Sequence, residues 1–113
     1  MADFSEVLLT GSTDGVFVNV VATASPGTVI HTAATAEKFD HIHLWASNVS
    51  TANKKLTVEF GSTISLIEVT IPFEDGLYTV VPGLPLTGAK VCRAFATATD
   101  VIFVGGYVVR RST

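Results

Sequence analysis

Charged side chains are scarce in this sequence, and cysteine is nearly absent. Asp, Glu, Lys and Arg make up 15 % of the 113 residues, against about 25 % in an average soluble domain. The hydrophobic content of 48 % excludes an intrinsically disordered chain. The net charge is −3 and the seven basic residues are scattered, so we expect no nucleic-acid partner. Cys92 stands alone, which excludes an intrachain disulfide and a multi-cysteine metal site.

The sequence also lacks a run of about 20 apolar residues, the length that a membrane-spanning helix needs. Residues 15–36 carry no charge, but Pro26 and His31 are among the residues that interrupt the stretch. Asp3 and Glu6 stand where a secretory signal would carry positive charge. We therefore expect neither a membrane partner nor export through a secretory signal.

Branched side chains are abundant instead. Val, Ile and Thr supply 37 residues, and they favour strands over helices. Strand-like segments separated by turn residues recur at the spacing of a sandwich or barrel. We predict an all-β fold, a single-domain antiparallel β-sandwich of about eight strands with jelly-roll-like order over 1–113, in which 1–27 form an N-terminal arm or edge strands. The predicted strands cover 6–10, 16–23, 28–33, 39–48, 55–60, 64–71, 77–81, 91–98 and 101–110.

Two local patterns carry further structural predictions. Apolar residues alternate in Phe39–Asn48 and in Lys55–Phe60, and a hairpin whose paired positions sum to 102 would bring the two apolar sides together. This register places His43 opposite Glu59 on the other face, beside Trp45. Such a mixture of aromatic, imidazole and carboxylate groups is typical of a contact surface. In the last strand, the pair at 105–106, both glycines, predicts a bulge or a close backbone approach.

The pair His41 and His43 is the strongest candidate for a metal site, because residues i and i+2 of a strand project to the same side. It resembles the start of a cupin metal motif, and Glu59 would supply a third ligand in the hairpin register. The glutamate and the later histidine of that motif are missing from this sequence. Packing across strands or against a partner is the better interpretation, so we predict no metal and no other cofactor.

Catalytic patterns are missing as well. The sequence holds no G-x-S-x-G elbow, and Cys92 lies within a predicted strand rather than at a helix start that would activate it. We predict that the protein is not an enzyme. Arg93 alternates in phase with Val91 and Phe95, so it either pairs with an acid of a neighbouring strand or subunit, or extends along the surface to solvent.

A string of segments resembles a known family. It consists of TVIHTA (28–33), FDHIHLWASN (39–48), KKLTVEFG (54–61), IEVTIP (67–72), GLYTVVPGLPLTG (76–88), VCRAFA (91–96) and VIFVGGYVVR (101–110). In this order the segments resemble small all-β proteins encoded by tailed bacteriophages and prophages, often among virion genes. The resemblance implies a structural virion role, such as a capsid decoration or cement protein, and it supplies no catalytic residues.

We therefore expect a virion protein, made in the host cytoplasm, that binds the major capsid protein or other virion proteins as a homo-oligomer, with a trimer favoured. Sparse charge supports association, because a free monomer of this size ordinarily carries more surface charge. One alternative is a neck, tail or host-attachment component of the virion, and another is a cupin-like or carbohydrate-binding domain. The predicted interface residues are His41, His43, Trp45, Glu59 and Arg93.

Overall fold

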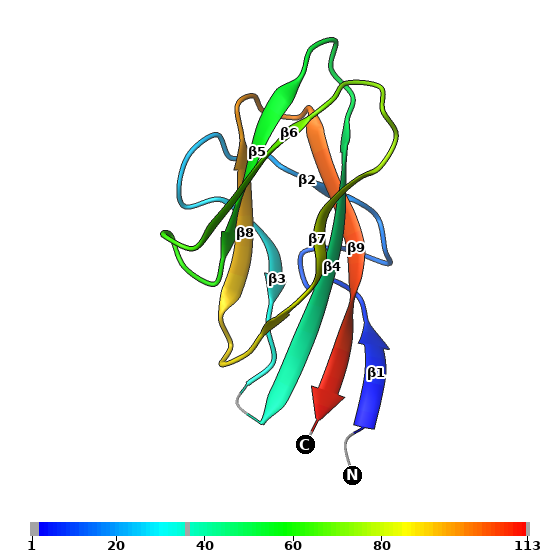
Figure 1. Ribbon diagram of the computed structural model, residues 1–113, viewed down its shortest axis with the longest axis vertical. Helices are drawn as coiled ribbons and strands as arrows, with labels where there is room; N and C mark the ends of the chain where they lie inside the picture. The colour runs from blue at the N-terminus through cyan, green and yellow to red at the C-terminus, as the bar shows by residue number, and fades with distance from the viewer. Residues whose placement is uncertain (1–2, 36, 113) are drawn as a thin grey trace.

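The computed structural model describes residues 3–35 and 37–112, which form two packed antiparallel sheets without a helix (Figure 1). The predicted all-β sandwich is confirmed. Sheet A contains β1, β9, β4 and β7 in that order, with β2 also paired to β9, and sheet B contains β3, β8, β5 and β6. The strands are β1 (Asp3–Val7), β2 (Val18–Asn19), β3 (Thr28–Thr32), β4 (Lys38–Asn48), β5 (Lys54–Phe60), β6 (Leu66–Ile71), β7 (Tyr78–Leu86), β8 (Val91–Ala96) and β9 (Ile102–Ser112).

The strand pairs nest inside one another along the chain. β5 pairs with β6, β4 with β7, β3 with β8 and β1 with β9, all antiparallel. The chain is thus one long hairpin, turned between β5 and β6 and rolled up so that successive pairs alternate between the sheets. The pairings β4–β9 and β5–β8 then join these pairs within each sheet. This arrangement is a jelly roll.

The predicted hairpin between β4 and β5 was wrong. β4 lies between β9 and β7 in sheet A, and β5 lies between β8 and β6 in sheet B. Asn48 holds the crossing loop by donating hydrogen bonds to the carbonyls of Ala52 and Ile71, at 2.9 and 2.8 Å. Two strands that face each other across a core show the same inward alternation as two paired neighbours. His43 and Glu59 therefore lie in different sheets and not opposite each other.

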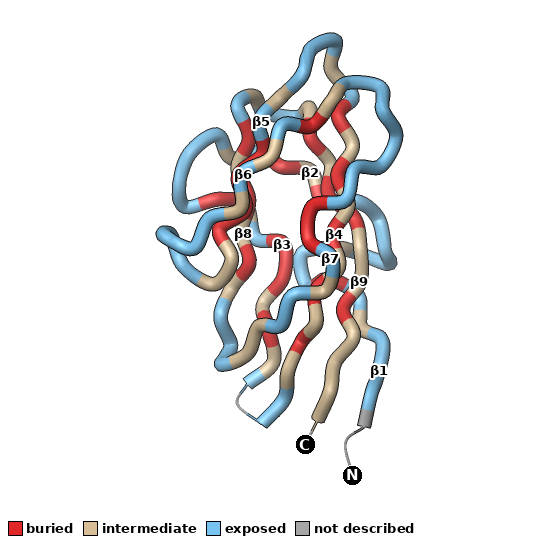
Figure 2. The backbone as a smooth tube through the Cα atoms, in the orientation of Figure 1, coloured by how far each residue is buried: buried red, intermediate tan, exposed pale blue. Residues whose placement is uncertain are grey.

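The apolar sides of β4 and β5 nevertheless point into one core, as predicted. Buried positions gather between the two sheets (Figure 2). Burying a Leu, Ile or Val side chain stabilises a fold by about 1.5 to 3 kcal/mol, so this shared core holds the sheets together. Phe60 packs against it while remaining half-buried. The fully buried residues of the two strands' inward sides are Ile42, Leu44, Ala46, Leu56 and Val58.

Gly106 marks a close approach of two backbones. A Cβ atom at this position would overlap the carbonyl oxygen of His43 on β4. The β4–β9 pairing runs without a register shift from Lys38 opposite Ser112 to Asn48 opposite Ile102. Of the two structures predicted for the glycine pair, the close approach is therefore confirmed and the bulge is absent from this pairing.

We predict that Leu44→Ala lowers the free energy of unfolding by about 3 kcal/mol, because truncating a fully buried leucine loses its transfer free energy and leaves a cavity. Leu77→Ala is the matched control, since Leu77 just before β7 is 55 % exposed and surface changes ordinarily cost under about 0.5 kcal/mol. Urea denaturation followed by circular dichroism measures both variants. Equal losses would show that the assignment of the inward side of β4 is wrong.

Candidate functional site

The five predicted interface residues lie on two separate surfaces. His41, His43 and Trp45 project from β4 on the outer side of sheet A, whereas Glu59 and Arg93 belong to the paired strands β5 and β8 of sheet B. The hypothesis that Glu59 joins the two histidines in a ligand set is wrong for this reason. Among residues 3–35 and 37–112, no group of three or more His, Cys, Asp or Glu side chains could hold a metal ion.

His43, Trp45 and Tyr107 stack on the outer side of sheet A, and we call these three residues the aromatic face. His43 of β4 stands directly opposite Tyr107 of β9. Their ring centres lie 4.7 Å apart with the planes inclined by 10°, and the rings of Trp45 and Tyr107 lie 5.9 Å apart at 25°. Aromatic rings attract one another at these separations. All three side chains are only half-buried, so the stack is open to contact.

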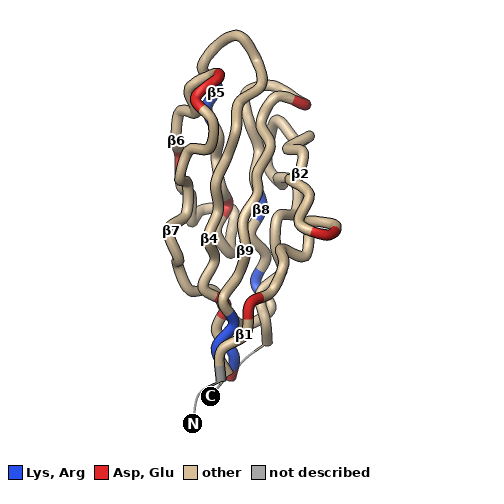
Figure 3. The backbone as a smooth tube through the Cα atoms, turned by 90° about the vertical axis from the view of Figure 1, so that its right-hand side faces the viewer, with Lys and Arg blue, Asp and Glu red and all other residues tan. Residues whose placement is uncertain are grey.

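The surroundings of the aromatic face are also apolar. Phe17 extends it, because its ring covers Gly105, the residue opposite Trp45, and is 42 % exposed. Between 41 and 47 on β4, and between 102 and 109 on β9, there is no Asp, Glu, Lys or Arg. Figure 3 shows the middle of both strands free of charged residues. A sheet face open to water ordinarily carries polar residues, so this face has the composition of a contact surface.

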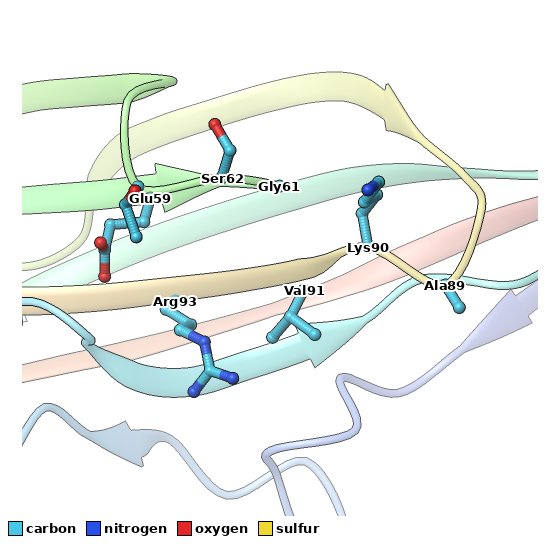
Figure 4. A pocket seen from close by; sticks show the side chains of 8 residues that line it. Glu59, Gly61, Ser62, Ala89, Lys90, Val91 and Arg93 are labelled. Atoms are coloured by element: carbon cyan, nitrogen blue, oxygen red, sulfur yellow. The ribbon is translucent and has the colours of Figure 1, made fainter.

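Glu59 is buried although it lies on the outer side of sheet B. The Ser25 hydroxyl and the Gly27 amide each donate a 2.7 Å hydrogen bond to its carboxylate, and these bonds anchor the loop before β3 onto the sheet. Arg93 stands opposite Glu59 in the β5–β8 pairing, and both line a pocket together with Lys90 (Figure 4). No ion pair involves Arg93 within the described part of the chain. Glu59 thus holds a loop and leaves Arg93 as the alternative contact residue, on sheet B.

A buried polar network that the sequence analysis missed lies at one end of the sandwich. Asp40 and His31 are both 0 % exposed, and His31 Nε2 lies 2.7 Å from Asp40 Oδ2. Arg110 donates two hydrogen bonds to this carboxylate, at 2.7 and 2.9 Å, and the Ala34 amide donates another at 3.1 Å. The Thr10 amide donates to Nδ1 of His31. The proton of the neutral imidazole is therefore on Nε2, which donates to Asp40.

The charges of this network follow from its contacts. Burial by itself raises the pKa of Asp40, but the hydrogen bonds from Arg110 and His31 outweigh burial and hold the pKa below its ordinary value. The hydrogen bond to Asp40 in turn raises the pKa of Arg110. Both nitrogens of His31 are occupied, so this histidine has no free site to act as a general base on a substrate. The network joins β3 of sheet B to β4 and β9 of sheet A and is structural.

Cys92 is equally unsuited to catalysis. The thiol is fully buried in the core, and burial raises its pKa to about 12. Because the thiolate is the reactive form, a thiol with this pKa is inert near neutral pH.

Comparison of the chain with protein-family models, curated proteins and solved structures finds no match. The part of the chain that the structure describes contains no helix long and apolar enough to cross a membrane. Function is therefore inferred from the geometry and from the sequence resemblance alone.

We predict that Asp40→Asn lowers the free energy of unfolding at pH 7 by about 3 kcal/mol, because it breaks a buried ion pair and leaves Arg110 uncompensated. Asp75→Asn is the control, since Asp75 is exposed in a loop, and it should change stability by less than about 0.5 kcal/mol. Urea denaturation of both variants measures the difference. Similar small losses would show that the network contributes little to stability.

Acid should weaken the same network, because it protonates Asp40. Because the folded-state pKa of Asp40 is lowered, its contribution is complete above the ordinary carboxyl pKa of 3.8 and is lost as the pH falls below that value through the folded-state pKa. The native protein should therefore lose more stability than Asp40→Asn between about pH 5 and about pH 2.5. Denaturation curves across this range measure the two slopes, and equal slopes would contradict the assignment.

Proposed function

We propose that this protein is a structural, non-enzymatic component of a bacteriophage virion, a capsid decoration or cement protein that binds the capsid surface as a small homo-oligomer. The observation that carries the proposal is the aromatic face on the outer side of a sheet, where the core does not need it. Placement in a virion, after synthesis in the host cytoplasm, comes from the sequence resemblance. The geometry adds a surface with which such a protein would make its contacts.

The aromatic face supports association for two reasons. Tyr and Trp are enriched in protein contacts, where large rings bury much area at little cost in conformational entropy. One edge of the same sheet, β7, carries Pro82 and Pro85, and prolines block pairing with a further strand there. Closed rotational symmetry then covers the apolar face without endless growth. A trimer would suit positions of local threefold symmetry on a capsid.

The other interpretations have less support in the geometry. A cupin-like metal site needs a carboxylate beside His41 and His43, and Glu59 lies in the other sheet. A carbohydrate platform needs free ring faces, whereas the His43 and Tyr107 rings are stacked on each other. A neck, tail or host-attachment component would use the same aromatic face and remains the alternative location.

We predict a mass near 36 kDa by light scattering coupled to size exclusion, three times the 11.9 kDa of one chain. Trp45→Ala should lower this mass toward 12 kDa and leave the β-type circular dichroism spectrum unchanged. Arg93→Glu, on the outer side of sheet B, should leave the mass unchanged. A lower mass for Arg93→Glu alone would move the interface to sheet B, and a monomeric native protein at micromolar concentration would reject the oligomer.

Electron microscopy of particles of the phage that encodes this chain tests the location. We expect density for the protein on the capsid surface, and substoichiometric density at the neck or tail would support the alternative. Absence of the protein from purified particles would overturn the virion assignment.

A further inference from the structure

A groove opens beside the aromatic face, at the end of sheet A where β4 begins. It is lined by Phe39, His41, Pro85, Leu86, Lys90 and Arg111. The guanidinium carbon of Arg111 lies 5.0 Å from the centre of the Phe39 ring, a distance at which a cation and an aromatic face attract each other. The groove therefore combines apolar walls from β4 and β7 with cations from β9 and from the loop that follows β7.

Among the side chains of residues 4–35 and 37–112, neither cation of the groove has an acidic partner. The ion pairs there involve other basic residues, and no Asp or Glu among them lines the groove. The Nε atom of Arg111 is buried and has no hydrogen-bond partner in the described chain. Such a site suits a carboxylate carried next to an apolar group, because the carboxylate pairs with Lys90 or Arg111 while the apolar group covers Phe39 and Leu86.

The edge strand β1 of the same chain has this chemistry. Phe4 is 67 % exposed, and Glu6 is also exposed. Phe4 pairs with Arg111 and Glu6 with Val109 across the β1–β9 ladder, so both side chains lie on the outer side of sheet A. In one chain, Phe4 stands next to Arg111, but Leu86 of β7 on the far wall is three strand spacings away, about 14 Å at about 4.8 Å each. The chain's own Phe4 does not line the groove, and a second copy can fill it.

We propose that Phe4 and Glu6 of one copy occupy the groove of the next copy, with the Phe4 ring against Phe39 and Leu86 and the Glu6 carboxylate on Lys90 or Arg111. This inference rests on the proposed function, since it adds a contact beside the aromatic face to the proposed homo-oligomer. The contact is head-to-tail, because it joins two different surfaces, and such contacts close into rings when the rotation permits. It uses the proline-free edge of sheet A and leaves the proline-bearing β7 edge unpaired.

Disulfide trapping tests the contact directly. The double variant Glu6→Cys/Lys90→Cys should give covalent dimers and trimers on a non-reducing gel after mild oxidation, and a reductant should remove them. An intrachain bond is too long to form, since bridged Cα atoms lie within about 7 Å. Native Cys92 is buried and unreactive, so it adds no background. The control Glu6→Cys/Lys55→Cys, which places the second thiol on sheet B, and each single variant should stay uncrosslinked.

Charge reversal supplies an independent test. Glu6→Lys and Lys90→Glu should each lower the mass of the oligomer toward 12 kDa, and the combined variant should restore it to about 36 kDa, with circular dichroism confirming that each variant folds. A native trimer that resists both single changes and gives no cross-link with the double cysteine variant would overturn this contact while leaving the proposed function standing. A monomeric native protein would overturn both. Cross-links from Glu6→Cys alone would show a symmetric contact between two β1 strands instead.

Discussion

The buried carboxylate of Asp40 fixes how the two sheets meet at one end of the sandwich. It must be paired to be buried, and its partners come from β3 of one sheet and from β9 of the other, the latter 70 positions along the chain. Successive residues of a strand point to opposite sides. Because Arg110 turns inward to Asp40, Arg111 is turned outward, over Phe39. The interaction that ties the sheets together thus also sets the position of the cation in the groove.

The outer sides of the two sheets differ because of a second buried carboxylate. Glu59 holds the loop before β3 against sheet B through Ser25 and Gly27, so a segment of the chain itself covers part of that sheet. On sheet A, by contrast, His43 and Tyr107 remain half-buried. Large rings that the chain itself does not cover are stabilised further when a partner removes them from water. Covering the aromatic face would therefore contribute the most free energy to the proposed association.

The nested pairing makes the two edges of sheet A unlike. One edge is β1, the outermost strand of the rolled hairpin, with Phe4 and Glu6 exposed; the other is β7, which carries two prolines. The proposed head-to-tail contact uses this difference, because each copy would offer β1 to the groove of the next copy. The low charge of the chain agrees with the proposed assembly, since surface that is covered by a partner needs no charge for solubility.

Local patterns in the sequence determined the fold class, the approximate strand positions and the inward sides of β4 and β5, because alternation and turn residues act within a few positions. The sequence also contained a signal for the buried network: Asp40 alternates in phase with Ile42, and Arg110 in phase with Val108. Which strands pair was decided only by the tertiary structure, since alternation does not distinguish a neighbour in the sheet from a strand facing it across the core. That choice separated His43 from Glu59 and brought His43 beside Tyr107 instead.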